Sequence, residues 1–275
     1  PQSSRDALKE LRARGVKTFI ATGRSKQLMM EAAGDLEFDG YITLNGVHCF
    51  TAGNRDIYRS RIPEDDVERL IAYSHSHPET PFVFVHDDTW FITRVDETVR
   101  EVAALIEIDI PPVRPAEYAR GKEIMQIMGY FPEKDDGEMF SRTLKHCTPM
   151  RWYPLFADII AAGNSKSHGI DKVLEYYGIS LEDTMAFGDG GNDIPMLSHV
   201  NIGVAMGNAS EKVQAAADYV TSSVDEDGIA TVAFAADSGV YGEPPEEQKD
   251  AYHVYDVEDW IYTVFNSVAE SLQAN

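Results

Sequence analysis

Two aspartates and an asparagine, close together after a short apolar run, are the residues in this sequence best placed to do chemistry. Residues 185–187 are apolar, Gly188 ends the run, and Asp189 and Asp193 follow with Asn192 beside them. If the run is a buried strand, both carboxylates lie at its carboxyl end, where open α/β sheets bind ligands. Mg²⁺ takes one or two carboxylates together with water and phosphate oxygens, so this turn predicts a magnesium site.

Other interpretations of this turn fit the sequence less well. A dinucleotide-binding fingerprint needs a glycine where Asp193 stands. An EF-hand loop counted from Asp189 needs a glycine and then a glutamate at positions that Ile194 and Val200 occupy. Asp193 could simply cap a helix that begins at Ile194, with Pro195 in its first turn. Capping alone, however, does not account for a second aspartate and an asparagine.

The composition is that of an ordinary globular protein with a strong acidic bias. The 275 residues suffice for one large domain or two smaller ones, and 43% hydrophobic and 25% charged residues are unexceptional. The net charge of −22 argues against nucleic acid or an anionic membrane surface as a partner. It also repels phosphorylated ligands at long range, so a phosphate site would depend on a metal ion and a few nearby cations.

Cysteine content and hydropathy predict a cytoplasmic protein. Cys49 and Cys147 lie far apart without metal-ligand spacing, which fits a reducing compartment. No apolar run approaches about 18 residues, and no signal peptide is recognisable. Because the sequence starts at Pro1 rather than methionine, we expect translation to begin upstream.

Helices and strands alternate near both ends of the sequence, which predicts an α/β core built on a doubly wound, Rossmann-like parallel sheet. We expect this core to comprise residues 1–62 and 161–236. Residues 63–160 mix hairpins with helices, which predicts an inserted α+β domain. The core strands are expected at 16–21, 40–44, 184–187, 201–205 and 219–221, with helices at 4–14, 25–34, 167–177, 192–199 and 210–217.

Residues 237–275 are expected to form a linker followed by a C-terminal amphipathic helix. The stretch 238–250 is rich in proline, glycine and glutamate, as linkers are. Asp256 would then cap a helix whose apolar stripe packs onto the core, with self-association through that stripe as the alternative. The stripe consists of Val257, Trp260, Ile261, Val264, Val268 and Leu272.

Three further positions offer groups that suit an anion, although each has an ordinary structural explanation. Thr22 follows a predicted strand and could bind phosphate through its hydroxyl and N–H, or cap the next helix. Lys166 opens a helix and could neutralise phosphate, but a lone lysine usually lies on the surface. Asn45 and Gly46 end another strand and could form only a turn.

The order of these motifs resembles that of the haloacid dehalogenase-like hydrolase superfamily. A strand ends in threonine, a lysine later opens a helix, and Gly-Asp-x-x-Asn-Asp follows another strand. More narrowly, residues 19–24, 41–46 and 188–197 resemble the Cof-type sugar-phosphatase branch. The resemblance covers about residues 1–235, including the inserted domain, and the tail has no counterpart in it.

The resemblance implies attack by an aspartate on phosphorus and hydrolysis of the resulting aspartyl-phosphate. Thr22 would hydrogen-bond the phosphoryl group, Lys166 would neutralise its oxygens, and Asn192 would support either of them. Asp189 would coordinate Mg²⁺, while Asp193 would hold the metal's waters or orient its neighbours. Residues 63–160 would be a cap that selects the substrate. The predicted substrate-binding residues are Gly23, Arg24, Asn45 and Gly46.

One part of the family pattern is missing from the sequence. The nucleophile and the general acid/base are two aspartates in an Asp-x-Asp motif, on a strand expected just before Pro1. Asp109 has isoleucine on both sides, and Asp225 and Asp227 come after a pair of serines in a late loop. Either the native protein carries about 20 more N-terminal residues, or the chain is an inactive relative. In the second case, the C-terminal helix could fill the gap left by the missing strand.

The sequence therefore predicts a Mg²⁺-dependent phosphatase of small phosphorylated metabolites such as sugar phosphates, competent only with an upstream Asp-x-Asp strand. The alternative is a non-catalytic module that binds a phosphorylated ligand or a protein. Cap residues that could face the substrate are His86, Asp87, Trp90, Lys122 and Met125.

Overall fold

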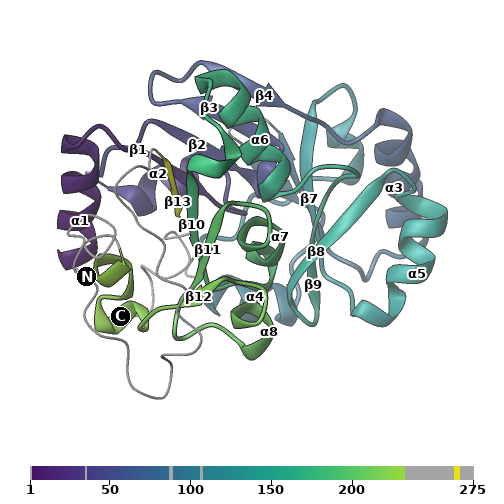
Figure 1. Cartoon of the computed structure of the whole chain (residues 1–275). Coiled ribbons are helices and arrows are strands. Elements are labelled where there is room, and N and C mark those ends of the chain that lie inside the picture. Colours follow the sequence, from purple (N-terminus) through teal and green to yellow (C-terminus); the bar gives the residue numbers. More distant parts are fainter. Residues whose placement is uncertain (1, 35, 87–88, 106–107, 233–262, 267–275) are drawn as a thin grey trace.

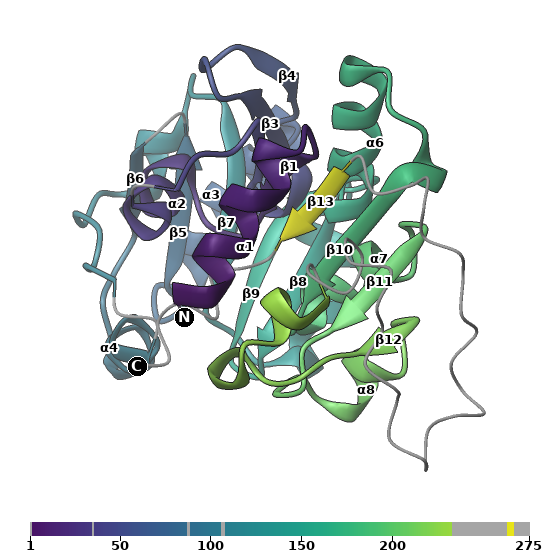
Figure 2. The same cartoon turned by 60° about the vertical axis from the view of Figure 1, so that its left-hand side comes forward.

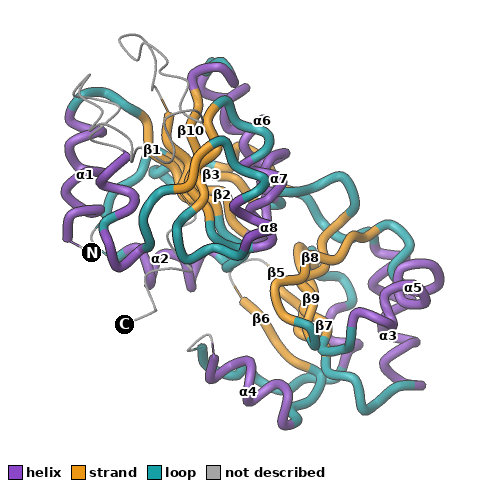
Figure 3. The backbone as a smooth tube through the Cα atoms, turned by 60° about the horizontal axis from the view of Figure 1, so that its bottom comes forward, coloured by secondary structure: helices purple, strands orange, loops and turns teal. Residues whose placement is uncertain are grey.

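Two β-sheets organise the chain, which is described by a computed structural model at residues 2–34, 36–86, 89–105, 108–232 and 263–266. An eight-stranded sheet has the order β12-β11-β10-β13-β1-β2-β3-β4, and a five-stranded sheet has the order β6-β5-β7-β9-β8. The two sheets lie in separate lobes (Figures 1 and 3). We call the lobe of the eight-stranded sheet the core and the other lobe the cap.

Most of the core sheet is parallel, as predicted. The parallel strands are β1 (Lys17–Ala21), β2 (Gly40–Thr43), β10 (Thr184–Gly188), β11 (Ile202–Ala205), β12 (Tyr219–Val220) and β13 (Thr263–Asn266). An antiparallel hairpin of β3 (His48–Thr51) and β4 (Asp56–Arg59) extends the sheet beyond β2. This hairpin was not predicted, because β4 is largely solvent-facing and its sequence lacks a clear alternation of apolar and polar residues.

Helices cover both faces of the core sheet, so neighbouring residues of β1 pack against different helices. On one face, Phe19 packs in a cluster with Ile170 of α6 (Lys166–Tyr177). The same cluster contains residues of α7 (Ile194–Leu197) and α8 (Glu211–Gln214). Ile20 packs with Leu8 of α1 (Gln2–Ala13) and Met29 of α2 (Lys26–Ala33) on the other face. This arrangement confirms the doubly wound α/β fold class. Of the helices that the structure describes, none is both long and apolar enough to cross a bilayer.

The strand β13, from the C-terminal tail, lies between β1 and β10 (Figure 2). Thr263 pairs with Lys17 on one side and with Thr184 on the other, and both pairings are parallel. The predicted helix from Asp256 is therefore wrong for residues 263–266. Threonine, valine and phenylalanine favour strands, and two flanking strands offer backbone partners on both sides. The predicted linker and the rest of the apolar stripe lie outside the described residues.

The cap is an antiparallel sheet with helices packed on both of its faces (Figure 3). Its strands are β5 (Phe82–His86), β6 (Thr89–Ile92), β7 (Ile124–Gly129), β8 (Cys147–Tyr153) and β9 (Phe156–Ala161), and its helices are α3 (Glu64–Ser76), α4 (Glu97–Leu105) and α5 (Asp136–Glu138). Leu70 of α3 packs on Phe84 from the outer side, whereas Val85 and Met128 belong to a cluster with Leu44 of the core. The inserted domain therefore presents one face of its sheet to the core.

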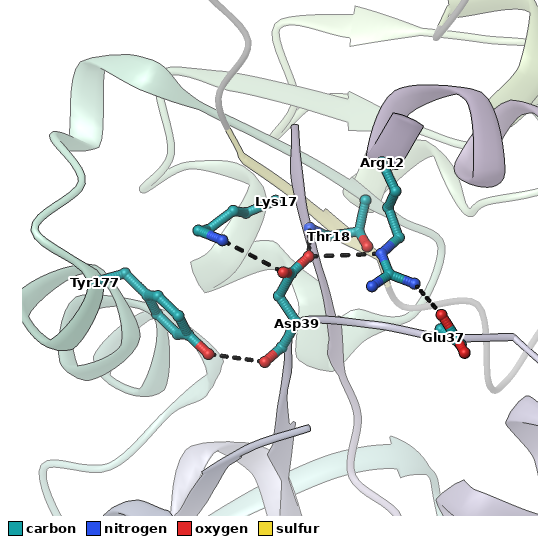
Figure 4. A network of polar contacts seen from close by, with 6 residues as sticks. All are labelled: Arg12, Lys17, Thr18, Glu37, Asp39 and Tyr177. Carbon is teal, nitrogen blue, oxygen red and sulfur yellow. Dashed lines mark hydrogen bonds and ion pairs between the residues drawn. The ribbon is translucent and has the colours of Figure 1, made fainter. Parts of the chain in front are cut away.

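A polar network fixes the amino-terminal edge of the core sheet (Figure 4). Asp39, just before β2, accepts hydrogen bonds from the Thr18 N–H at 3.0 Å and the Lys17 ammonium at 3.3 Å, and pairs with Arg12 at 3.7 Å. Its carbonyl accepts from the Tyr177 hydroxyl at 2.7 Å. These contacts tie α1 and α6 to the sheet at the edge opposite the carboxyl ends of the parallel strands, so they support the fold rather than the site.

Candidate active site

The acidic turn lies at the carboxyl end of β10, as its sequence predicts. A Cβ added to Gly188 would lie 2.7 Å from the Cβ of Asp193, so only glycine leaves room for the Asp193 side chain to fold back under the strand. A 3-10 turn, Gly191–Asp193, then leads into α7. Asp189 is left at the sheet edge, partly exposed.

Lys166 and Asp193 form a fully buried ion pair beneath this edge. The Lys166 ammonium, on the first residue of α6, donates to Oδ1 of Asp193 at 2.6 Å, and both side chains are 0% exposed. The other oxygen of Asp193 accepts from the N–H groups of Asp189 at 3.0 Å and Gly190 at 2.9 Å. Because both oxygens of Asp193 are engaged, the geometry favours an orienting role for it over direct binding of a metal.

Asp189 is the carboxylate best placed to bind a cation. Burial raises the pKa of Asp189, and the nearby charge of Asp193 raises that pKa further. The Asn208 amide donates to one of its oxygens at 3.2 Å. Within the described residues, no group of three or more His, Cys, Asp or Glu side chains is placed to hold a metal. One partly exposed carboxylate that lines a cavity fits Mg²⁺, which needs few carboxylates and takes its other ligands from water and phosphate.

Thr22 and Asn45 lie side by side at the ends of β1 and β2. Thr22 is buried, and its carbonyl accepts from the Asn45 N–H at 3.0 Å. Its hydroxyl oxygen accepts from the Arg24 N–H at 3.1 Å. Asn45 has a left-handed backbone with φ 55°, in a short 3-10 turn, Leu44–Gly46. Both side chains reach the same edge of the sheet as Asp189, because the parallel strands end there.

The amide of Asn192 connects the acidic turn to Asn45. Nδ2 of Asn192 donates to Oδ1 of Asn45 at 3.2 Å. Oδ1 of Asn192 is buried and has no hydrogen-bond partner among the described residues. A buried acceptor without a donor is destabilising, so this oxygen is suited to accept a hydrogen bond from a bound ligand or from Lys166.

The predicted substrate-binding residues fall into two groups. Gly23 and Arg24 line a cavity between the core edge and the cap, along with Asp189. Asn45 and Gly46 are not among its lining residues. The φ of Gly46 is +96°, and a Cβ there would lie 1.9 Å from the Ser165 carbonyl oxygen. Gly46 thus lets the turn pack against the start of α6, and a substrate contact at this residue stays a prediction.

Sequence reasoning missed three polar residues that the structure brings to this region. Asn208 donates to Asp189, and Gln126 and Asp158 of the cap contact Asn45. A signal for the cap pair exists, since Gln126 and Asp158 are single polar residues inside the otherwise apolar strands β7 and β9. However, the sequence does not give the register of β7 against β9, so it does not predict that these two side chains are neighbours.

A doubly wound core with an inserted cap, and a lysine–aspartate pair beneath the carboxylate of Asp189 at the carboxyl edge of the sheet, define a class of enzyme built for phosphoryl chemistry. The sequence matches the haloacid dehalogenase-like hydrolase family over residues 1–232, and the chain belongs to that family. Membership makes the protein an enzyme of the phosphoric monoester hydrolase class.

Individual relatives agree with this assignment. The chain is 36% identical over 231 residues to YkrA of Bacillus subtilis strain 168, which carries the name of a phosphatase, covering 84% of this chain and 88% of YkrA. The structure is similar to that of the subclass IIB sugar phosphatase BT4131, with a TM-score of 0.77, 41% identity, and coverage of 84% and 90%. A B. subtilis 5-amino-6-(5-phospho-D-ribitylamino)uracil phosphatase, YcsE, is 26% identical over 82% of this chain and 84% of its own.

Proposed function

We propose that the protein is a Mg²⁺-dependent phosphatase of small phosphorylated metabolites of the sugar-phosphate kind. The observation that carries the proposal is the buried Lys166–Asp193 pair, which holds the acidic turn so that Asp189 stays at the sheet edge. A buried ion pair contributes little to stability by itself, so its presence beneath Asp189 supports a role in the chemistry at the sheet edge. The named sugar phosphatase among the relatives supports the substrate class.

The roles of the chain's own residues follow from their positions. Bound at Asp189, Mg²⁺ would supply positive charge for the phosphoryl oxygens. Lys166, held at 2.6 Å from Asp193, contributes a second positive charge without the need to reorganise. Thr22 offers its hydroxyl to the phosphoryl group, and the buried Oδ1 of Asn192 can accept from Lys166 or from a phosphate hydroxyl. Phosphoryl transfer depends mainly on such positioning and charge neutralisation.

We propose further that an aspartate of an Asp-x-Asp strand upstream of Pro1 attacks phosphorus, giving an aspartyl-phosphate that water hydrolyses. A strand that precedes α1 would reach the sheet through a right-handed crossover beside β1. The neighbours of β1 in this chain are β2 and β13, so that strand would take the position of β13. The upstream strand and β13 would then exclude one another.

One observation favours the alternative of a non-catalytic module that binds a phosphorylated ligand or a protein. In this chain β13 completes the sheet between β1 and β10. The anion-binding residues Thr22 and Lys166 do not depend on the nucleophile, so ligand binding could persist without turnover. A small phosphorylated metabolite is the proposed partner in either case. The buried free thiols of Cys49 and Cys147 support the cytoplasm as its location.

The intact mass of the native protein, or the codons before Pro1, separates the two functions. An Asp-x-Asp motif after four or five apolar residues supports the enzyme, whereas an in-frame stop codon there supports the binding module. We expect the native protein to hydrolyse p-nitrophenyl phosphate and Asp189→Ala to lower kcat by at least about 100-fold, the scale of losing a principal charge stabiliser. Asp171→Ala, on the exposed side of α6, is the matched control. Residues 1–275 alone should show no turnover.

A further inference from the structure

The cavity between the core edge and the cap has two chemically different walls. Its volume is about 610 Å³, and the core contributes Asp189, Gly190 and Arg24 at one end. The cap sheet contributes the other wall, on which two polar residues stand among large apolar ones. The polar residues are Gln126 and Asp158, and the apolar residues are Val85, Trp90, Met128 and Phe156.

Gln126 and Asp158 form a hydrogen-bonded pair across β7 and β9. Nε2 of Gln126 donates to Oδ1 of Asp158 at 3.1 Å. The exposed fractions are only 2% for Gln126 and 4% for Asp158. Burying a carboxylate is costly unless hydrogen bonds compensate for the lost water. A polar pair buried in an otherwise apolar sheet face therefore destabilises the fold, which points to a role in binding a ligand in the cavity.

Asn45 joins this pair to the phosphate side of the site. Its Nδ2 lies 3.3 Å from Oε1 of Gln126 and 3.3 Å from Oδ2 of Asp158, so one amide group is shared between two acceptors at long distances. Bonds of this length are weak and can be exchanged for contacts with a ligand. Asn45 also accepts from Asn192. A ligand bound to Gln126 and Asp158 would thus be connected, through the side-chain amides of Asn45 and Asn192, to the neighbour of Asp193 in the sequence.

The chemistry of these two walls selects the leaving group. An ionised carboxylate is an acceptor only, and an amide both accepts and donates, so the pair matches hydroxyl groups. Trp90 and Met128 offer apolar surface to the C–H faces of such a molecule.

We propose that Asp158 and Gln126 are the specificity-determining pair of this enzyme and that they bind the hydroxyls of a polyhydroxylated leaving group. This inference rests on the proposed phosphate site. Asn45 is a positioning residue that links the pair to Asn192. The competing explanation is a latch, in which the contacts between Asn45 and the cap pair only hold the cap against the core.

Calorimetric titration of the chain in the presence of Mg²⁺ separates these explanations. The probes are D-glucitol 6-phosphate, n-hexyl phosphate, which has the same carbon count without the hydroxyls, and inorganic phosphate. We expect glucitol 6-phosphate to bind more tightly than hexyl phosphate. Asp158→Asn should weaken glucitol 6-phosphate binding by about 10- to 100-fold, the size of lost hydrogen bonds to a charged group. Binding of the other two probes should change by less than about twofold.

The control is Asp136→Asn, which removes a cap carboxylate that pairs with Arg151 outside the cavity lining and should alter the binding of no probe. Equal weakening of all three probes by Asp158→Asn would overturn the proposal in favour of the latch. Tighter binding of hexyl phosphate than of glucitol 6-phosphate by the wild type would overturn it as well. If no probe binds with or without Mg²⁺, the phosphate site itself is wrong, and this failure is distinct from the other two.

Discussion

Breaking the Lys166–Asp193 pair one partner at a time should destabilise the protein strongly, because each single change leaves a buried charge without its counter-charge. Both side chains are 0% exposed and their atoms lie 2.6 Å apart. Removing one partner of such a pair costs about 3–5 kcal/mol. For Lys166→Met in a chain of this size, that loss corresponds to a fall in Tm of about 6–20 °C.

Asp193→Asn should cost at least as much. The amide keeps one oxygen for the N–H groups of Asp189 and Gly190, and it leaves the ammonium of Lys166 buried without an opposite charge. The double variant has neither charge. It should therefore recover about 2–3 kcal/mol of the summed single losses, the upper part of the range of interaction energies between contacting residues.

Urea denaturation of the wild type, both single variants and the double variant measures this interaction energy directly. Lys172→Met is the matched control, because Lys172 lies on the same helix and pairs with Glu175 on the surface. Its loss should stay below about 1 kcal/mol. Additive single losses, within about 0.5 kcal/mol, would refute the buried pair. So would a Lys166→Met loss no larger than that of Lys172→Met.

Three further perturbations test other parts of the structure. The raised pKa of Asp189 means that its ionised form is disfavoured on folding, so wild-type stability should fall relative to Asp189→Asn as the pH rises above about 4 without Mg²⁺; parallel Tm–pH curves would contradict this. Gly46→Ala should lower the free energy of unfolding, measured by urea denaturation, by about 3 kcal/mol or more, since its Cβ would lie 1.9 Å from the Ser165 carbonyl oxygen. Gly163→Ala is the control and should cost only about 1 kcal/mol, because a Cβ at Gly163 would have no atom within 4 Å. Ending the chain at residue 236 should lower its Tm, because β1 and β10 lose the strand between them; an unchanged Tm would argue against β13.

The predictions from sequence succeeded where one local pattern decides the structure. Residues 185–187 are apolar and Gly188 ends the run, and the strand β10 and its acidic turn lie where that pattern places them. The burial of Lys166 was not predictable, because a lysine at a helix start is usually solvated and only the tertiary contact with Asp193 buries it. The same holds for the tail. Its apolar residues have a helical period, but residues 263–266 form a strand because β1 and β10 provide backbone hydrogen-bond partners on both sides.

The cap shows the same division between local and tertiary information. The hairpin of β5 and β6 was predicted, because two apolar runs flank a polar turn. Trp90, one of the cap residues expected to face the substrate, lines the cavity, and its contact with a substrate stays a prediction. Asp158 and Gln126 escaped notice because their meeting depends on the register of β7 against β9, which a single sequence does not specify.

The Mg²⁺ dependence of p-nitrophenyl phosphate hydrolysis by the native protein tests the central claim most directly. The rate should rise to saturation with added Mg²⁺, fall to background with excess chelator, and return when Mg²⁺ is restored. Asp189→Ala should lose this response. Turnover that persists in the chelator, or a Mg²⁺ response retained by Asp189→Ala, would contradict the assignment of the acidic turn after β10 as the metal and phosphate site.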